Sequence, residues 1–456
     1  MTKLTFYGGV NEIGGNKILV EDKDTKVFFD FGLSFSKGTK FYTRFLSSRN
    51  VAGAADDMEL GILPAIKGLY SQEMLKFTPL KYEEPKFDAI FLTHAHMDHV
   101  AHIQYIDEKI PLYLGETTQN VLKSFSPGKE VEEEFGNREY KTFRTGSKIK
   151  IGSLEVEPFH VDHSIPGAYG FFIHTGDGTI VYTGDLRMHG PACQMTKDFI
   201  EKAASYDPIA MICEGTRVGR KPQTTENMTE EGVHKIANKI TSKSNKLVIT
   251  TFYGRDVDRI KTFYNTAIEN DRTFVVSMKT ANLLHKLKDD SMLNVPDPLT
   301  DKRVKIYARR KKTGSYSETD YYIWERPYLA NMITYDEIQA NEKKYLLNLD
   351  FYNFNELIDI KPTPGGEFIH SMSEPFSEGG MDQIEHDILK NWLSHFKLKL
   401  RQAHASGHMS ADEIKKMVNH IKPEVLIPIH TENAKKFSSI IKTKVLVPRE
   451  KKKIIL

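Results

Sequence analysis

The sequence contains one unusually informative segment, Thr93-His94-Ala95-His96-Met97-Asp98-His99, which follows an apolar run with strand character. Alternate side chains of an extended chain point to the same side, so His94 and His96 can bind one metal ion. The turn that follows directs Asp98 and His99 toward a second position. Imidazole and carboxylate are ligands that zinc accepts, at about 2.0–2.2 Å. The segment therefore predicts a metal site at the end of a buried strand.

Three further residues of the same chemical types stand at the ends of other apolar runs: His163, Asp185 and His430. Each of them alone is more often structural than functional. Side chains at the carboxyl ends of neighbouring strands can converge on one edge of a sheet, as in the clefts of α/β proteins. Together with the 93–99 segment, these residues predict a site for two metal ions.

The composition excludes several classes of protein. The chain has 456 residues, 39% hydrophobic and 27% charged, which is typical of a globular protein with two or three domains. A net charge of +2 gives no overall field that indicates a nucleic-acid partner. No apolar run approaches the roughly 18 residues of a membrane span, and the N-terminus lacks a signal-peptide pattern. Two cysteines, Cys193 and Cys213, cannot form a disulfide framework, so we expect a cytoplasmic protein.

Secondary-structure signals divide the chain into two kinds of region. Residues 1–35 and 88–182 alternate short strand-like runs with glycine turns, and a mixed excursion, 37–85, separates them. From about residue 216, strand-like runs alternate with helical patterns of about 10–15 residues, which is typical of parallel βαβ units. Because the candidate ligand His430 lies beyond this part, the simplest organisation is a β-rich domain that an α/β segment interrupts.

The ordered set of candidate residues resembles the metallo-β-lactamase fold and, more narrowly, the β-CASP ribonucleases of the ribonuclease J type. The resemblance rests on Asp30, the 93–99 segment, His163, Asp185 and His430, on Gly8-Gly9-Val10-Asn11-Glu12-Ile13-Gly14-Gly15-Asn16, and on the β-CASP markers Glu214, His408 and His430. It covers essentially the whole chain.

The implied fold class is α/β, a metallo-β-lactamase αββα sandwich with an inserted α/β β-CASP domain. The implied limits are 1–215 and 399–456 for the two parts of the sandwich and 216–398 for the insertion. Because the chain ends soon after His430, it looks like the shorter archaeal form.

The resemblance also implies a role for each candidate residue. One ion is assigned to His94, His96, His163 and Asp185, and the other to Asp98, His99, Asp185 and His430, so that Asp185 bridges the two. Asp30 is implied to orient a ligand from outside the metal shell. His408 is implied to stabilise the phosphate or to protonate the departing oxygen, and Glu214 to hold it in place. Asp98 is implied to help orient the attacking water. Four residues are implied to bind RNA phosphate: His404, Ser406, Ser371 and Ser373.

These roles imply a two-metal phosphodiesterase that degrades single-stranded RNA in RNA processing and decay. The expected enzyme is a 5′→3′ exoribonuclease that prefers 5′-monophosphate ends. Zinc is the expected ion and manganese the alternative, because His and Asp ligands serve both. The alternative functions are a β-CASP endoribonuclease, a DNA nuclease, a small-molecule hydrolase and a non-catalytic scaffold, of which the complete ligand set opposes the last. The family also suggests a homodimer.

Three features have no assigned function in the sequence. His102 follows the metal segment, where the family usually has small residues, and we expect a structural role for it. The basic run Arg309-Arg310-Lys311-Lys312 is expected to be a solvated loop, with contact to RNA phosphate as the alternative. The excursion 37–85 is longer than the resemblance predicts.

Overall fold

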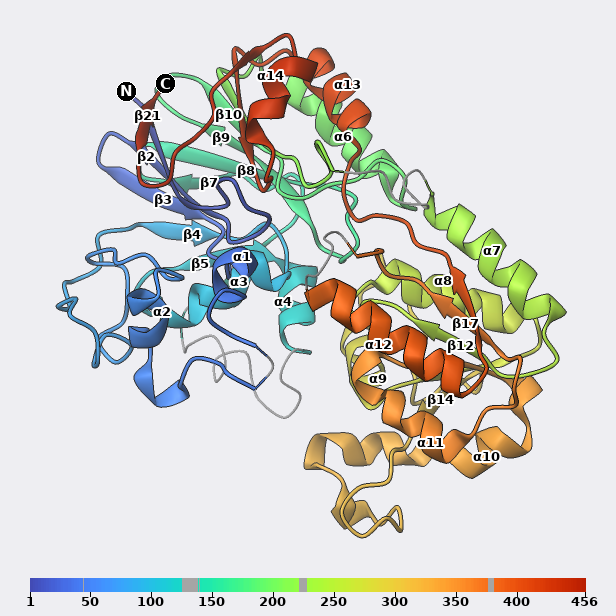
Figure 1. Ribbon diagram of the computed structural model, residues 1–456. Helices are drawn as coiled ribbons and strands as arrows, with labels where there is room; N and C mark the ends of the chain where they lie inside the picture. Colours follow the sequence, from blue (N-terminus) through green and yellow to red (C-terminus); the bar gives the residue numbers. More distant parts are fainter. Residues whose placement is uncertain (44, 125–137, 139, 221–227, 376–380) are drawn as a thin grey trace. The chain divides into compact units, whose positions relative to one another are not determined.

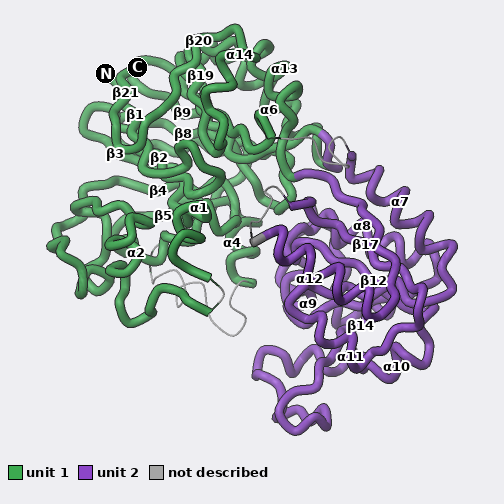
Figure 2. The backbone as a smooth tube through the Cα atoms, viewed as in Figure 1, with its two compact units in different colours: residues 1–188, 192–220, 407–456 green, residues 189–191, 221–406 purple. Residues whose placement is uncertain are grey.

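The chain folds into two units, each with its own sheet structure (Figures 1 and 2). Unit 1 consists of residues 1–188, 192–220 and 407–456, and unit 2 of residues 189–191 and 221–406. The computed structural model describes residues 1–43, 45–124, 138, 140–220, 228–375 and 381–456. None of the helices in these ranges combines the length and the hydropathy that a membrane span requires.

Unit 1 contains two sheets. The first has the strand order β21-β1-β2-β3-β4-β5-β6, with β1 (Lys3–Gly8), β2 (Lys17–Asp22), β3 (Thr25–Phe29), β4 (Ala89–Phe91), β5 (Leu112–Gly115), β6 (Tyr140–Phe143) and β21 (Lys453–Ile455). The second has the order β20-β19-β11-β10-β9-β8-β7, with β7 (Ile149–Ile151), β8 (Leu154–His160), β9 (Tyr169–His174), β10 (Thr179–Tyr182), β11 (Ala210–Glu214), β19 (Val425–Ile429) and β20 (Lys444–Val445). Strands β3 and β4 are parallel, as are β10, β11 and β19. The carboxyl ends of the parallel strands within each sheet therefore lie at one edge.

Apolar side chains from both sheets form a common core. Phe6 and Phe29 of the first sheet and Phe171 and Ile212 of the second belong to one buried cluster. The Phe29 and Phe171 rings lie 5.4 Å apart, centroid to centroid. Complete burial of each such side chain contributes roughly 1.5–3 kcal/mol. The two sheets are thus held face to face as a sandwich.

Helices cover the other face of the second sheet: α6 (Cys193–Ala204), α13 (Ala411–Ile421) and α14 (Phe437–Ile440). In α13, Ile414, Val418 and Ile421 recur at helical spacing and pack on the sheet beside Phe199 of α6. Ser410 caps the helix in a capping box with Glu413. Figure 1 shows α6 and α13 side by side. The expected α/β sandwich is confirmed.

The excursion between β3 and β4 contains short helices and turns, including α1 (Phe35–Gly38) and α2 (Ala55–Glu59). The buried carboxylate of Asp57 accepts hydrogen bonds from the hydroxyls of Tyr42 (3.2 Å) and Tyr105 (2.9 Å). These bonds attach the excursion to the segment that follows the metal-ligand motif. After β4 come α3 (Met97–Val100) and α4 (Glu116–Leu122).

Unit 2 has one parallel sheet with the strand order β15-β14-β13-β16-β12-β17-β18. Its strands are β12 (Val248–Thr251), β13 (Thr273–Val276), β14 (Val304–Tyr307), β15 (Met332–Ile333), β16 (Tyr345–Asn348), β17 (Glu367–His370) and β18 (Lys399–Gln402). Its helices are α7 (Glu230–Lys243), α8 (Val257–Glu269), α9 (Met278–Leu287), α10 (Tyr335–Ala340), α11 (Leu357–Ile360) and α12 (Met381–His395). Side-chain caps from Thr229, Asp256 and Ser277 begin α7, α8 and α9.

The division between the units differs from the expected domain limit. The sequence placed the limit at 398/399, whereas the second division of the compact units falls between Ser406 and Gly407. The reason is that β18 pairs in parallel with β17 along its whole length, from Glu367–Lys399 to His370–Gln402. A strand signal of only four residues, Lys399–Gln402, does not show which sheet the strand joins.

Candidate metal centre

The predicted metal-ligand residues all lie in unit 1, just beyond the carboxyl ends of its strands. His94 and His96 follow β4, and Asp98 and His99 lie in α3. His163 follows β8, Asp185 follows β10 and His430 follows β19. The structure therefore brings together side chains that are up to 336 residues apart in sequence, which is the separation of His94 from His430.

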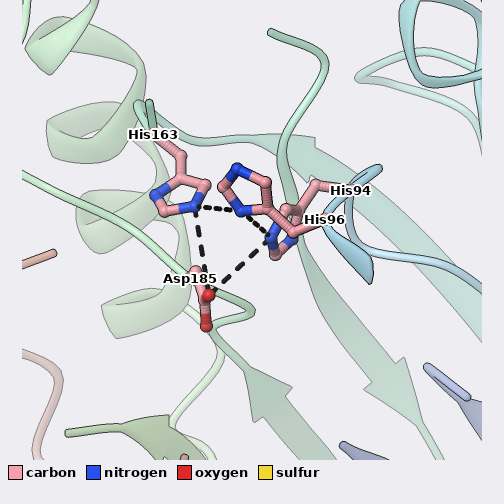
Figure 3. Close-up of side chains that lie close together, drawn as sticks. All are labelled: His94, His96, His163 and Asp185. Atoms are coloured by element: carbon pink, nitrogen blue, oxygen red, sulfur yellow. Dashed lines mark hydrogen bonds and ion pairs between the residues drawn. The ribbon is translucent and has the colours of Figure 1, made fainter. Parts of the chain in front are cut away.

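The first cluster consists of His94, His96, His163 and Asp185 (Figure 3). His96 Nδ1 lies 3.0 Å from His94 Nε2 and 3.1 Å from His163 Nε2. Asp185 Oδ2 lies 3.7 Å from His94 Nε2 and 3.9 Å from His163 Nε2. A tetrahedron with metal–ligand bonds of about 2.0–2.1 Å has edges of about 3.3–3.4 Å, so these separations fit one small metal ion.

The second cluster consists of Asp98, His99 and His430. His430 Nε2 lies 3.1 Å from Asp98 Oδ2, and His99 Nε2 lies 3.9 Å from the same oxygen. Asp185 Oδ2 is close to this cluster as well, 3.1 Å from His99 Nε2 and 3.6 Å from His430 Nε2. One carboxylate oxygen is therefore shared by both groups, which is the arrangement of a bridging ligand.

Hydrogen bonds at the other ring nitrogens orient several imidazoles. His163 Nδ1 donates to the carbonyl of Gly407 (2.6 Å), which leaves the Nε2 lone pair facing the cluster. His99 Nδ1 donates to Asp30 Oδ2 (2.8 Å), and His430 Nδ1 lies 2.8 Å from Thr216 Oγ1. Such partners fix the ring tautomer in metal sites. The predicted orienting role of Asp30 thus has a hydrogen bond to support it.

Burial and charge set the protonation of these rings. Burial, together with the neighbouring imidazoles, lowers the pKa of His94 and His163 well below its usual range, so these rings are neutral and can donate lone pairs. Burial also opposes a charge on His99, but Asp185, Asp30 and Asp98 outweigh it and raise the His99 pKa well above its usual value. This concentration of carboxylates, in which Asp185 Oδ1 is buried without a hydrogen bond among the described residues, suits a cation.

Backbone conformation supports the same assignment. Asp30 (φ 59°) and His430 (φ 55°) both adopt the left-handed region that non-glycine residues rarely occupy. In each case the turn comes directly after a strand, β3 or β19, at the edge of the sheet where the clusters lie. Gly14 (φ 77°) explains part of the glycine-rich opening, because a Cβ there would lie 2.6 Å from Asp98 Cβ. Its neighbour Gly15 donates its backbone N–H to the carbonyl of Asp98 (3.0 Å).

His408 and Glu214 lie beside the two clusters in unit 1. His408 Nδ1 is 3.0 Å from Glu214 Oε1, and the imidazole is 20% exposed. The His408 ring lies 5.1 Å from the His163 ring and 5.6 Å from the His430 ring, centroid to centroid. A buried carboxylate thus orients an accessible imidazole that borders both clusters without belonging to either.

The four predicted phosphate-binding residues lie in unit 2. Ser373 Oγ is 3.2 Å from His404 Nε2, and burial, with the Arg259 charge, lowers the His404 pKa to about 3. Ser371 is 2% exposed, and its hydroxyl is already engaged by Arg259 and the carbonyl of Ala403. The Ser406 carbonyl accepts a hydrogen bond from His189 Nε2 (2.7 Å). The geometry groups His404 with Ser373 and gives Ser371 a buried structural environment.

Arg259, which belongs to none of the predicted sites, organises this part of unit 2. Its fully buried guanidinium forms a two-pronged ion pair with Glu230 (2.8 and 3.0 Å). It also donates to the carbonyls of Ser371 (2.7 Å) and Ala405 (3.1 Å). The rigid planar fork of arginine serves several acceptors at once, which the single ammonium of lysine cannot do.

We expect Arg259→Lys to lower the free energy of unfolding by about 2 kcal/mol, because charge-assisted hydrogen bonds to Glu230 and the loop carbonyls are lost. Denaturant unfolding measures the change. The matched control is Arg303→Lys, which alters an exposed ion pair with Asp301 and is expected to cost under about 1 kcal/mol. Equal stability of the two variants would contradict the role of Arg259.

Three hydroxyl residues at the metal centre were also not selected from the sequence. Tyr182 donates to Asp30 Oδ2 (2.6 Å), Thr93 donates to Asp30 Oδ1 (3.0 Å), and Thr216 contacts His430. Each stands within three residues of a predicted site residue, but this proximity in sequence does not by itself identify them. His102 belongs to neither cluster. Its side chain is buried, and the centroid of its ring lies 5.6 Å from that of Tyr105. Its ring nitrogens have no hydrogen bond within the described ranges.

Two family models match the chain. Residues 63–241 match the Beta-lactamase superfamily domain, and residues 394–448 match the Zn-dependent metallo-hydrolase RNA specificity domain. The first match contains His94, His96, Asp98, His99, His163 and Asp185, and the second contains His408 and His430.

The chain is similar to curated proteins over most of its length. It is 24% identical to ribonuclease J of Mycoplasma genitalium over 449 residues, which cover 94% of this chain and 68% of that protein. It is 26% identical to ribonuclease J2 of Bacillus subtilis over 365 residues, 75% of this chain and 58% of that protein. A crystal structure of a protein of unknown function from Enterococcus faecalis V583 matches over the whole of both chains, with a TM-score of 0.76 and 25% identity.

Proposed function

Since the chain belongs to the metallo-β-lactamase/β-CASP family of metallo-hydrolases, we propose that it is a two-metal phosphodiesterase that degrades single-stranded RNA. The observation that carries the proposal is the pair of His/Asp clusters that share Asp185 Oδ2. The RNA specificity segment at 394–448 and the similarity to ribonuclease J proteins support RNA as the substrate. Cys193 and Cys213, which are not bridged, support a reducing cytoplasm.

In this proposal, one ion is held by His94, His96, His163 and Asp185, and the other by Asp98, His99, Asp185 and His430. Zinc is the proposed ion. When bound, such a pair of ions lowers the pKa of water and neutralises charge on a phosphoryl group. Asp98 and Asp185 supply the negative charge that keeps the ions in place, and Asp30 holds the His99 ring in the orientation that binds.

His408 is the proposed general acid. Its ring borders both clusters, and Glu214 fixes it through Nδ1, so Nε2 is the nitrogen that can give a proton to the departing oxygen. Glu214 also accepts a backbone hydrogen bond from Thr216 (3.0 Å) and is therefore itself fixed. The acid is thus positioned before the substrate binds.

We also propose a direction of degradation. The protein is a 5′→3′ exoribonuclease that acts in RNA processing and decay. Digestion of RNA labelled at its 5′ end tests it. We expect the label to appear first as a mononucleotide, with no cleavage of DNA of the same sequence. Labelled fragments of intermediate length would instead indicate an endoribonuclease, and an inactive preparation with full metal content would contradict the ribonuclease assignment.

We further expect RNA with a 5′-monophosphate to be degraded at least about tenfold faster than RNA with a 5′-triphosphate. The reason is that His404, Ser373 and Ser406 offer few donors, and two additional phosphates would remain unpaired, at a cost of about 1.4 kcal/mol or more. Rates on the two RNAs measure the preference. Ser373→Ala is expected to weaken it and the exposed Ser315→Ala to leave it unchanged. Equal wild-type rates on both RNAs would contradict the proposal that His404, Ser373 and Ser406 bind the 5′-phosphate.

A further inference from the structure

Unit 2 contains a cavity of about 280 Å³ that none of the roles above uses. Its walls come from the segments that follow three adjacent parallel strands, β13, β14 and β16. Helix α9 begins there at Met278 and lies beside β14 (Figure 1). The volume is close to the lower limit of ligand pockets, roughly 300 Å³, and suits one small ligand.

The topology of the sheet explains why a cavity exists at this place. Strands β13 and β16 are neighbours in the order β14-β13-β16-β12-β17. The chain leaves β13 toward β14 on one side, whereas it leaves β16 toward β17 on the other. Adjacent connections that diverge in this way open a crevice at the carboxyl ends of the strands, and open α/β sheets bind ligands in such crevices.

One wall of the cavity is basic. Lys279, Arg309 and Lys311 line it. Lys311 is neutralised by both carboxylate oxygens of Glu325. Arg309 donates to the amide oxygen of Asn353, and within the described ranges neither Arg309 nor Lys279 has a carboxylate partner. Two exposed cations beside the first turn of a helix suit an anionic group such as a phosphate.

The cavity also contains hydrogen-bond acceptors and an aromatic ring. Asp350 Oδ2 accepts a hydrogen bond from Asn353 Nδ2 (2.7 Å), whereas Asp350 Oδ1 is buried and has no hydrogen bond among the residues that the structure describes. Asn348 lies beside it, and Tyr352 at the rim is 68% exposed. A buried carboxylate oxygen without a donor favours a ligand with hydroxyl or amino groups, and the ring suits a base that stacks on it.

We propose that this cavity binds one nucleoside monophosphate unit. The phosphate lies against Lys279 and Arg309, a ribose hydroxyl or base amino group donates to Asp350, and the base stacks on Tyr352. Every residue of the cavity belongs to unit 2, whereas both His/Asp clusters belong to unit 1, so the two are different sites. The unit is either a free mononucleotide or a nucleotide of an RNA strand, and only the second source rests on the proposed function.

The test is calorimetric titration of the full-length protein with AMP. We expect the Lys279→Ala/Arg309→Ala double variant to bind AMP at least about tenfold more weakly, because charge-assisted contacts to phosphate are lost. Both side chains are exposed, so folding is expected to be retained, and circular dichroism checks it. The matched control is Arg310→Ala/Lys312→Ala in the same basic run, since Arg310 pairs with Asp359, Lys312 donates to Thr319, and neither lines the cavity.

Two further arms separate the sources and the sites. If the Lys279→Ala/Arg309→Ala variant loses affinity for AMP but not for a short oligoadenylate, the natural ligand is a free mononucleotide. If it loses affinity for both, the ligand is a nucleotide of an RNA strand. In an Asp185→Asn background, from which the metal centre is removed, AMP binding at the cavity is expected to persist even if RNA cleavage is absent. The proposal is overturned if AMP does not bind, if the double variant binds it normally, or if the control loses as much.

Discussion

Asp185→Asn is expected to remove both metal ions and to reduce RNA cleavage by more than about 10³-fold. Asp185 Oδ2 lies 3.1–3.9 Å from the Nε2 atoms of four imidazoles, those of His94, His99, His163 and His430. An amide at this position carries no negative charge, and its NH2 group presents hydrogen-bond donors where the carboxylate oxygen presented lone pairs. The two effects therefore have one cause, and metal analysis by mass spectrometry with single-turnover cleavage measures both on the same preparation.

A buried carboxylate elsewhere in unit 1 is the matched control. Asp57→Asn removes a charge that two tyrosine hydroxyls contact and that belongs to neither cluster, and we expect it to keep both ions and normal cleavage. Chelation of the wild-type protein should reproduce the loss seen with Asp185→Asn, and added zinc should reverse it. Full activity of metal-free protein would overturn the two-metal proposal, and Asp185→Asn protein with two tightly bound ions would overturn the bridging role.

The residues of the metal centre could be selected from the sequence because their chemistry is unusual and part of it is local. Two histidines, an aspartate and a third histidine within six positions have few structural explanations, and the structure places all seven predicted ligands in two adjacent clusters. Thr93, Tyr182 and Thr216 could not be selected in this way. Hydroxyl residues are common in the chain, which has 20 tyrosines alone, and only the folded geometry shows which ones face an imidazole or Asp30.

The alternation of strands and helices predicted the parallel sheet of unit 2, but not the order of its strands. Strand β16 lies between β12 and β13 although it follows both in sequence. That order depends on contacts between distant apolar segments, which periodicity does not encode. The cavity at the β13–β16 boundary was therefore not foreseeable, and the basic run 309–312, expected to be a solvated loop, contributes two of its four side chains to the cavity wall.

His408→Ala is expected to separate metal binding from proton transfer. The variant should keep both ions, because no donor atom of either cluster belongs to His408, and should lose roughly 10²–10⁴-fold in cleavage rate.

Glu214→Gln should lose less of the cleavage rate than His408→Ala, since the amide oxygen still accepts from His408 Nδ1–H although the negative charge is gone. The exposed His420→Ala, in α13 and outside both clusters, should be normal in both measurements. RNA binding should survive in His408→Ala, because a general acid acts on the departing oxygen and contributes little to ground-state affinity. A metal-depleted His408→Ala protein, or one with near-normal cleavage, would contradict the general-acid role, while the Asp185→Asn result would still decide the two-metal centre.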